Sequence, residues 1–318
     1  MNFELLNSLG KQRKPFLFIS DFEAKKIEII LLDELENFDV EYSIDENYNS
    51  NSNSNLNSHL KALKKIPLDF KNYKNKFNFV IQEIKKGNTY LLNLTQPTKI
   101  ETKLNLKEIF SLSNAHYKLR YKDEFVCFSP EKFVQIRDNK ISTFPMKGTI
   151  DASIKGAKAK ILSDAKEMAE HIMIVDLLRN DLSIVSKNVQ VEKFRYITKI
   201  SAGKKNLLQV SSHISGDLDV YWHENIGNIL KKLLPAGSIS GAPKKSTLDI
   251  IKKVENYKRD FYSGVFGVYD GLSFDSGVMI RFIQSTKDGL VYKSGGGITL
   301  DSILKNEYEE MLEKVYIP

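Results

Sequence analysis

The chain has 318 residues, 42% of them hydrophobic, and a formal net charge of +7. This length and composition fit a folded globular protein with one large domain or two small ones. No apolar run approaches the length of a membrane-spanning helix, and the N-terminus lacks the pattern of a signal peptide. The single cysteine, Cys127, excludes an internal disulfide and favours the reducing cytoplasm as the place of action.

The positive charge raises the question of nucleic-acid binding. The basic residues are mostly lysines that are scattered along the chain, whereas specific contacts to bases and phosphates favour arginine. We therefore expect no nucleic-acid partner, and we keep a Lys-rich nucleic-acid-binding protein as the alternative from outside the enzymes. A basic surface would also attract a small dianionic substrate.

The first 65 residues predict a short N-terminal region. A helix-like stretch is followed by two strands, at 16–19 and 27–32. The Asn/Ser-rich tract at 47–58 is typical of a solvated loop. We expect the N-terminal strands to form one continuous domain with the main region, 66–318.

The main region begins with a helix from Phe70, whose apolar residues recur at helical spacing until Gly87 ends it. The segment 89–96 then predicts a buried strand. The segment 125–145 predicts two strands around a turn at Asp138-Asn139, which form a hairpin.

That hairpin would bring Glu131 near Lys147, which stands in the stretch T-F-P-M-K-G-T. Pro145 fixes one backbone angle, which constrains the backbone around Lys147, and Gly148 permits the close approach of a ligand. A lysine held away from water has a lowered pKa and can act as a nucleophile or base. Taken alone, the local pattern around Lys147 is more typical of an exposed turn. Taken alone, Glu131 is more typical of an acidic residue at a helix N-terminus or in a turn.

Two helices carry a repeated pair of carboxylates. Glu167 and Glu170 are three residues apart and share one helix face, and Glu307 and Glu310 repeat this spacing on the last helix. Two such pairs can share a hard cation such as Mg2+, which prefers oxygen ligands. By pattern alone, two solvated acidic faces are the simpler interpretation.

Four further segments complete the prediction. The basic stretch 152–164 is expected to be a mobile connection, and 195–218 predicts strand, loop, strand. The segment 234–244 predicts a rigid turn between helices, whose backbone N–H groups either face an anion or serve only the turn. The segment 262–284 predicts paired strands.

Strands and helices alternate without strict β-α order. This predicts an α/β (α+β) protein with mostly antiparallel sheets and helices outside, without a parallel dinucleotide-binding sheet. The glycine-rich stretch at 295–297 lacks a dinucleotide fingerprint, so NAD binding is not expected.

Six motifs in this order resemble those of the chorismate-utilising enzymes, over roughly residues 75–318. The motifs are S-P-E-K-F around Glu131, T-F-P-M-K-G-T around Lys147, E-M-A-E-H from Glu167, L-P-A-G-S-I-S-G-A-P-K from Leu234, S-G-G-G-I-T from Ser294 and E-Y-E-E-M-L-E-K from Glu307. Within this family they are most similar to the aminodeoxychorismate synthase large components. The resemblance implies two stacked sheets of the anthranilate synthase component I type, with the active site between them.

The resemblance also implies roles for residues of this chain. Lys147 would attack the ring of chorismate while Glu131 protonates the departing hydroxyl. The positions that match substrate-binding residues of the family are Gly148, Thr149, Gln209, Ser240, Gly241, Tyr262, Arg281, Gly296, Gly297 and Lys314.

For the metal, the resemblance implies Mg2+ as the cofactor. Glu170 and Glu310 would bind it directly, and Glu167 and Glu307 would act through water.

Two positions depart from the family pattern. Leu91 stands where the isochorismate branch has a water-activating lysine and the aminodeoxychorismate branch usually has a glutamine. Gln209 stands where relatives usually have a histidine, and glutamine cannot shuttle a proton; His213, four residues later, is more typical of a sheet surface. Lys147 argues against anthranilate synthase, whose members carry a small residue there, and Leu91 argues against isochorismate or salicylate synthase.

The expected activity is therefore the amination of chorismate to 4-amino-4-deoxychorismate, on the route to 4-aminobenzoate and folate. Ammonia would come from a separate glutamine amidotransferase subunit. The enzyme alternatives are anthranilate synthase component I and an isochorismate or salicylate synthase.

Overall fold

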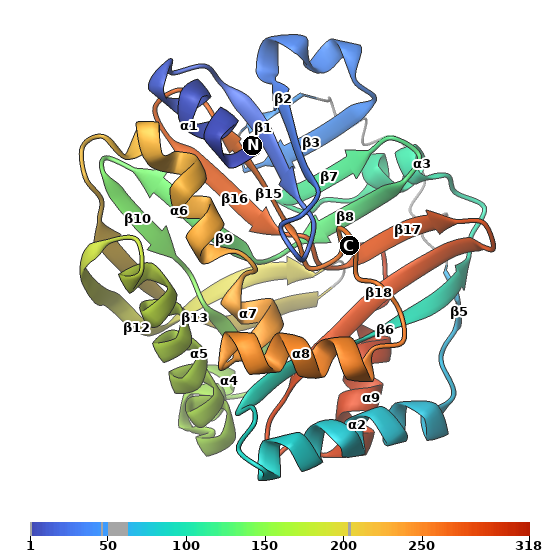
Figure 1. Ribbon diagram of the computed structural model, residues 1–318. Coiled ribbons are helices and arrows are strands. Elements are labelled where there is room, and N and C mark those ends of the chain that lie inside the picture. The colour runs from blue at the N-terminus through green and yellow to red at the C-terminus, as the bar shows by residue number, and fades with distance from the viewer. Residues whose placement is uncertain (1, 46, 50–62, 203–204) are drawn as a thin grey trace.

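The computed structural model describes residues 2–45, 47–49, 63–202 and 205–318. In these residues two nine-stranded sheets lie against each other, and helices surround them (Figure 1). Every strand pairing is antiparallel. The predicted fold class is confirmed.

The first sheet has the strand order β11-β13-β10-β9-β16-β15-β1-β2, and β12 pairs with β13. Its strands are β1 (Phe16–Ser20), β2 (Ile27–Leu31), β9 (Lys132–Arg137), β10 (Lys140–Thr143), β11 (Met146–Asp151), β12 (Lys187–Ala202), β13 (Lys205–Asp217), β15 (Val265–Tyr269) and β16 (Phe274–Val278).

The second sheet has the order β14-β6-β18-β17-β8-β7-β3-β4, and β5 pairs with β6. Its strands are β3 (Val40–Ile44), β4 (Asn47–Tyr48), β5 (Lys64–Ile66), β6 (Leu91–Glu101), β7 (Tyr117–Tyr121), β8 (Phe125–Ser129), β14 (Gly241–Ala242), β17 (Phe282–Thr286) and β18 (Gly289–Ile298).

The helices lie outside the sheets, with α5 packed on β12 and β13, and with α2, α8 and α9 gathered beside β6 and β18 (Figure 1). The helices are α1 (Asn2–Lys11), η1 (Leu32–Asn37), α2 (Phe70–Lys85), α3 (Leu106–Leu112), α4 (Ala157–Ser163), α5 (Ala165–Ser183), η3 (Trp222–Asn225), α6 (Ile226–Leu233), α7 (Gly237–Ser240), α8 (Lys244–Val254) and α9 (Leu304–Glu313). No helix of the described residues is long and apolar enough to cross a membrane.

Local chemistry explains where the two longest helices begin. The carboxylate of Asp69 accepts hydrogen bonds from the backbone N–H groups of Lys71 and Asn72 and so caps α2. Asp164 caps α5 by accepting from the N–H of Glu167 at 2.9 Å. Capping satisfies backbone donors that have no partner within the helix. Asp164 thereby fixes the first turn of α5, on which Glu167 stands.

Much of the expected element order is found, including the helix from Phe70 and the hairpin of β1 and β2. The turn Asp138-Asn139 joins β9 to β10 with both residues at positive φ, as a two-residue hairpin turn requires. In the Asn/Ser tract, Asn47–Tyr48 form β4, and the remainder from residue 50 lies outside the described residues. The basic stretch 152–164 is not a plain connection, because it contains α4.

The expected hairpin around Asp138-Asn139 is found, but its first strand is divided into β8 and β9. The expected pairing within 262–284 is wrong. In both places the chain crosses from one sheet to the other. The first crossover, at Pro130-Glu131, separates β8 in the second sheet from β9 in the first. The second, at 279–281, separates β16 in the first sheet from β17 in the second, so β15 pairs with β16 instead. Pro130 lacks a backbone N–H and Arg281 has a φ of 51°, so neither continues a strand.

The two crossovers lie side by side. The N–H of Val278 donates to the carbonyl of Glu131 at 3.0 Å, and that of Phe128 donates to the carbonyl of Arg281 at 3.2 Å. These bonds place Glu131 and Arg281 next to each other where the two sheets meet.

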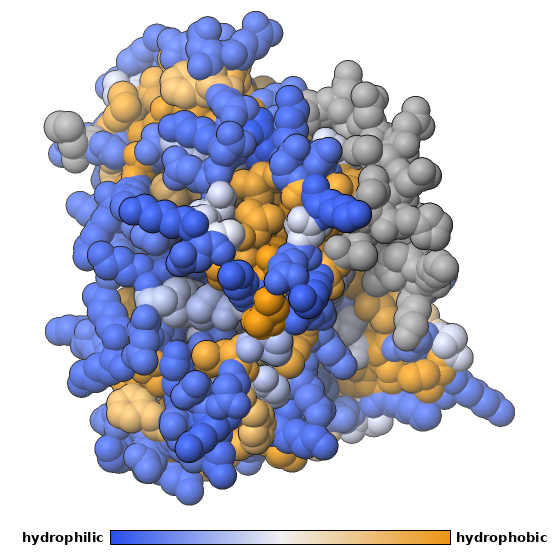
Figure 2. All heavy atoms as spheres, turned by 90° about the vertical axis from the view of Figure 1, so that its right-hand side faces the viewer, coloured by the Kyte–Doolittle hydropathy of each residue, from blue (hydrophilic) through white to orange (hydrophobic). Residues whose placement is uncertain are grey.

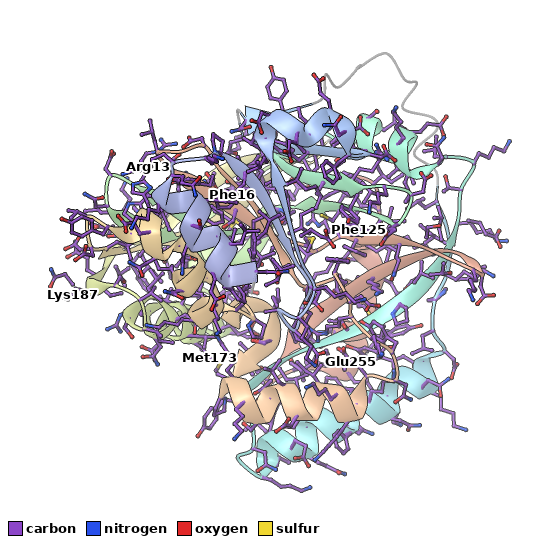
Figure 3. All side chains as sticks on the ribbon, turned by 45° about the horizontal axis from the view of Figure 1, so that its top comes forward. Arg13, Phe16, Phe125, Met173, Lys187 and Glu255 are labelled. Atoms are coloured by element: carbon purple, nitrogen blue, oxygen red, sulfur yellow. The ribbon has the colours of Figure 1, made fainter. Side chains whose placement is uncertain are left out.

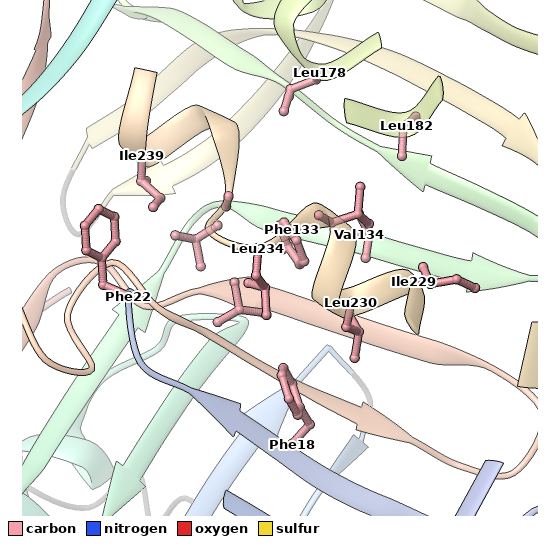
Figure 4. Packing of buried hydrophobic residues seen from close by; sticks show 14 of the residues in the cluster. Phe18, Phe22, Phe133, Val134, Leu178, Leu182, Ile229, Leu230, Leu234 and Ile239 are labelled. Atoms are coloured by element: carbon pink, nitrogen blue, oxygen red, sulfur yellow. The ribbon is translucent and has the colours of Figure 1, made fainter. Parts of the chain in front are cut away.

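The largest core cluster joins the first sheet to the helices around it, and Figure 4 shows side chains of α5 and α6 packed toward β9 and β1. A second cluster fills the space between the sheets, and a third lies under α3 and the C-terminus. Figure 2 shows the face on the right of Figure 1, where hydrophilic residues surround a central strip of hydrophobic ones. Because apolar burial is the main stabilising contribution, these clusters fix the two sheets as a rigid frame.

Candidate active site

A cavity of about 660 Å³ lies where the two sheets, both crossovers and helices α5, α7 and α9 meet. Nearly all the candidate residues from the sequence line it, although they come from distant parts of the chain. Those that line it are Glu131, Lys147, Gly148, Thr149, Glu167, Glu170, Gln209, Gly241, Tyr262, Arg281, Gly296, Gly297, Glu307, Glu310 and Lys314.

Ser240 is the candidate that the structure places elsewhere. Its side chain is fully buried, and its hydroxyl donates to the carbonyl of Ala236 at 2.9 Å within α7. Ser238, Ile239 and Gly241 line the cavity instead. The sequence did not indicate this short helix, whose turn directs Ser240 away from the cavity.

Lys147 stands on β11 with its side chain 35% exposed, and its Nζ lies 2.7 Å from a carboxylate oxygen of Glu170. Burial lowers the pKa of this lysine, but the carboxylates of Glu170, Glu310 and Glu167 raise it by more. The net shift is upward, which is opposite to the lowered pKa expected from the sequence. The ion pair with Glu170 is the physical reason.

Glu131 follows the first crossover. Burial raises the pKa of its carboxyl, while the hydrogen bond of the Ser238 hydroxyl and the charges of Lys314 and Lys147 oppose the shift. The net direction is upward. A carboxyl that keeps its proton at higher pH is suited to general acid catalysis.

Lysines neutralise one carboxylate of each helical pair. Glu170 of α5 contacts Lys147 and also lies 3.7 Å from Lys166. Glu310 of α9 pairs with Lys314 at 2.9 Å, and this lysine donates to the carbonyl of Gly295 in the glycine-rich stretch. The carboxylates therefore face the cavity from two helices with bound counter-charges.

The other carboxylate of each pair is less satisfied. Burial raises the pKa of Glu167 and of Glu307. Glu307 accepts a hydrogen bond from Ser302 at 2.8 Å, whereas Oε2 of Glu167 is buried without a hydrogen-bond partner. A Cβ at Gly148 would lie 2.9 Å from that oxygen and would force it to shift, and the φ of 87° at Gly148 also favours glycine.

This donor set fits a hard cation. Four carboxylates on two helices supply oxygen ligands at the cavity, and the buried Oε2 of Glu167 has no hydrogen-bond partner that would compensate its burial. Among the described residues, no three acidic, His or Cys side chains converge closely enough to hold a metal in the present arrangement. The lysines take the place of a cation in it.

Other residues of the cavity lining suit a carboxylate of a ligand. Tyr262 is almost fully buried, and the guanidinium of Arg281 lies 5.0 Å from the centre of the Tyr316 ring. The backbone of Gly296 and Gly297 also lines the cavity, and Gly296 lies next to Glu307 and Lys314. Arginine binds carboxylates with two parallel hydrogen bonds, and glycines allow backbone N–H groups to approach as well.

Several lining residues were not found from the sequence, among them Asn93, Lys166, Ser238 and Tyr316. Asn93 lies two residues after Leu91 on β6 and so faces the same side, which the strand period could have indicated. Tyr316 follows the last helix, and no local pattern indicates its place.

The two departures from the family pattern also lie at the cavity. Leu91 and Gln209 both line it. His213 does not line it, and instead contacts the hydroxyl of Ser142 at 3.1 Å and stacks on Phe144. This agrees with a histidine on a sheet surface.

Comparison with known proteins gives relatives over nearly the whole chain. An uncharacterized PabA-like protein of Haemophilus influenzae is 49% identical over 317 residues, which is 99% of this chain and 95% of that protein. Anthranilate synthase component 1 of Aquifex aeolicus is 31% identical over 80% of this chain and 55% of its own. Aminodeoxychorismate synthase component 1 of Bacillus subtilis is 33% identical over 61% of this chain and 42% of its own.

The fold has solved counterparts as well. The crystal structure of anthranilate synthase component I from Streptococcus pneumoniae matches with a TM-score of 0.67 and 26% identity, over 80% of this chain and 58% of that one. The Escherichia coli isochorismate synthase MenF matches with a TM-score of 0.74 over 98% of this chain and 79% of that one, at 15% identity, which bears on the fold alone. The family model described as chorismate binding enzyme matches residues 16–318. This range contains the two crossovers between the sheets and all lining residues of the cavity. The chain therefore belongs to the family of chorismate binding enzymes.

Proposed function

We propose that this chain is an aminodeoxychorismate synthase, which replaces the C4 hydroxyl of chorismate with an amino group from ammonia. The observation that carries the proposal is the meeting of Lys147 and Glu131 in one cavity, a primary amine and a carboxyl of raised pKa. The closely related PabA-like protein and the aminodeoxychorismate synthase of Bacillus subtilis support the family and are compatible with this reaction.

In the proposed reaction, the neutral amine of Lys147 forms a bond to C2 of the ring. The ring double bonds shift, the C4–O bond breaks, and the proton of Glu131 leaves with the hydroxyl as water. Ammonia then bonds to C4, the double bonds shift back, and the C2–N bond to Lys147 breaks. The proton that ammonia loses returns to Glu131, so the net change is chorismate plus ammonia to 4-amino-4-deoxychorismate plus water.

Other residues of the cavity bind the substrate. Arg281, Tyr262 and the backbone of Gly296 suit its carboxylates. We propose Glu170 and Glu310 as the direct ligands of Mg2+, with Glu167 and Glu307 acting through water. When bound, Mg2+ would supply positive charge for the ring carboxylate. As a metal ligand, Glu170 would raise the pKa of Lys147 less than it does in the ion pair.

The rival reactions differ in what they require. An isochorismate synthase must activate water, and the alkyl side chain of Leu91 cannot do so. In anthranilate synthesis the amino group is added at C2, which is the atom that we assign to the bond with Lys147. The similarity to the Aquifex aeolicus protein keeps this rival open to experiment. Incubation with chorismate, Mg2+ and an ammonium salt, followed by identification of the product by mass and retention, distinguishes all three.

The source of ammonia gives a prediction. Cys127 is completely buried in β8, and burial raises the pKa of its thiol, so it cannot serve as the thiolate that attacks glutamine. The chain should form product with ammonium and none with glutamine. Adding a glutamine amidotransferase subunit should restore the use of glutamine. Glutamine-dependent product from the isolated chain would contradict the proposed partner. We propose that this chain and the amidotransferase subunit act together in the cytoplasm, where a thiol such as that of Cys127 stays reduced.

The raised pKa of Glu131 gives a second prediction. An ordinary glutamate has a pKa of 4.5, and burial raises that of Glu131. As a general acid it must hold its proton, so the rate should persist above pH 4.5 and fall as the pH rises through the raised pKa. Glu131→Gln should lower kcat by roughly a hundredfold or more and lose this limb of the pH profile. An unchanged profile in Glu131→Gln would assign the acid to another group.

A further inference from the structure

A buried ion pair lies beneath the part of the cavity wall that β6 and α7 form. Glu255 directly follows α8, and Arg259 stands four residues later. Both side chains are 2% exposed, and Nη2 of Arg259 lies 2.7 Å from Oε1 of Glu255. Figure 3 shows Glu255 near the end of α8. Neither residue lines the cavity.

The guanidinium of Arg259 reaches two residues that do line it. Nη1 donates to the carbonyl of Ile239 in α7 at 2.9 Å, and Nη2 donates to the carbonyl of Asn93 in β6 at 2.6 Å. The side chain of Asn93 also donates to the carbonyl of Ile239 at 3.1 Å. The arginine therefore joins a strand of the second sheet to the short helix α7.

The rest of the cluster holds Arg259 in place. Glu255 accepts a second bond from Nε of the guanidinium at 2.8 Å, and it also accepts from the backbone N–H and the hydroxyl of Thr95. The carbonyl of Arg259 accepts from the N–H of Tyr262 at 3.1 Å and from Nζ of Lys293 at 2.9 Å. One buried residue thus contacts three residues of the cavity wall.

We propose that Arg259 is a positioning residue for the reaction, which holds α7 so that the Ser238 hydroxyl reaches the carboxyl of Glu131. The role of Glu131 as the acid rests on the proposed function. Ser238 adjoins Ile239, whose carbonyl accepts a hydrogen bond from the guanidinium. The hydroxyl of Ser238 makes a hydrogen bond to the carboxyl of Glu131, and this bond lowers the pKa of the carboxyl.

Arginine suits this position because its planar fork presents five donors in fixed directions. In this site they bind one carboxylate and two carbonyls at the same time, and the Phe22 ring covers the guanidinium at 4.5 Å. A lysine keeps the positive charge beside Glu255, but its single ammonium cannot bind Ile239, Asn93 and Glu255 in the same geometry.

Arg259→Lys is therefore the test, with Arg120→Lys as its matched control. Arg120 is equally buried and also pairs with carboxylates, those of Asp39 and Glu41, but it stands on β7 and does not line the cavity. With ammonium as the nitrogen source, Arg259→Lys should lower kcat by about ten- to about a hundredfold, with a smaller change in KM for chorismate. Its falling pH limb should also move to higher pH, because the bond from Ser238 lowers the pKa of Glu131. Arg120→Lys should change none of these.

Hydrogen exchange of the amides in 236–242 gives a readout without turnover. It should become faster in Arg259→Lys and stay unchanged in Arg120→Lys. If kcat, the pH limb and this exchange are all unchanged in Arg259→Lys, the ion pair is only structural and the proposal is overturned. If the wild type itself were inactive, the proposed function would be overturned. Hydrogen exchange of the amides in 236–242 would then test by itself whether Arg259 positions α7. If Arg259→Lys does not fold, Glu255→Gln, which keeps the shape of the side chain, replaces it with the same expectations.

Discussion

Lys147→Arg is expected to reduce the formation of 4-amino-4-deoxychorismate to background. The guanidinium stays charged at any working pH and is not nucleophilic, so it cannot form the bond to C2. It retains the positive charge beside Glu170, so binding of the dianionic substrate should change far less than turnover. Product formation and chorismate binding, measured on the same preparation, separate these two effects.

A covalent intermediate is the direct sign of this nucleophile. With chorismate and Mg2+ but without ammonia, the intact mass of the protein should rise by that of chorismate minus water. Peptide mapping should place the change within Phe144–Ile150. Lys147→Ala should lose the adduct, because the amine that forms the bond is absent.

Lys132→Arg is the matched control for Lys147→Arg. Lys132 is also shielded from solvent, and it pairs with Asp275 at 3.2 Å, but it does not line the cavity. Its replacement should leave amination and the adduct intact. If Lys147→Arg kept a near-normal rate, the case for amination at C4 over anthranilate synthesis would lose its main residue.

Several strands could be predicted from the sequence, among them β1, β2, β6 and β10, whereas β3 and β7 were not found, and the assignment of strands to the two sheets could not be predicted. The turn at Asp138-Asn139 carries its own signature, because both residues tolerate positive φ. The crossovers at Pro130-Glu131 and Arg281 are short breaks inside apolar runs. Strands buried on both faces have the same pattern in either sheet, so only the tertiary contacts decide which sheet receives them.

In the candidate site, too, local spacing could be predicted from the sequence, whereas contacts between distant segments could not. The spacing of Glu167 and Glu170 indicates a shared helix face, and both do face the cavity. The ionisation of Lys147 could not be predicted, because its pairing with Glu170 joins a strand to a helix across the fold. Tyr316 likewise reaches the cavity through the fold of the C-terminal segment and not through a local pattern.

Glu170→Gln and Glu310→Gln are each expected to abolish Mg2+-dependent turnover while the fold stays intact. Mg2+ prefers anionic oxygen ligands, and each change removes one carboxylate that faces the cavity. A ligand that binds only the folded state raises its stability, so added Mg2+ should raise the Tm of the wild type and not that of either variant. Thermal unfolding with and without Mg2+ therefore tests the metal site without turnover.

Glu309→Gln is the control on the same helix. Glu309 adjoins Glu310, but it is exposed, pairs with Lys305 at 3.8 Å and does not line the cavity. Both its turnover and its response to Mg2+ should match the wild type. Full activity of Glu170→Gln and Glu310→Gln at low Mg2+ would contradict the metal assignment.

Glu170→Gln also separates the metal from the nucleophile. The carboxylate of Glu170 raises the pKa of Lys147, whereas burial lowers it. Its removal should therefore lower the pKa of Lys147 and enlarge the fraction of neutral amine at a given pH. A loss of turnover in this variant would therefore not come from a higher pKa of Lys147. If the adduct on Lys147 also fails to form in Glu170→Gln at saturating chorismate, the result would support the proposed role of Mg2+ in binding the ring carboxylate.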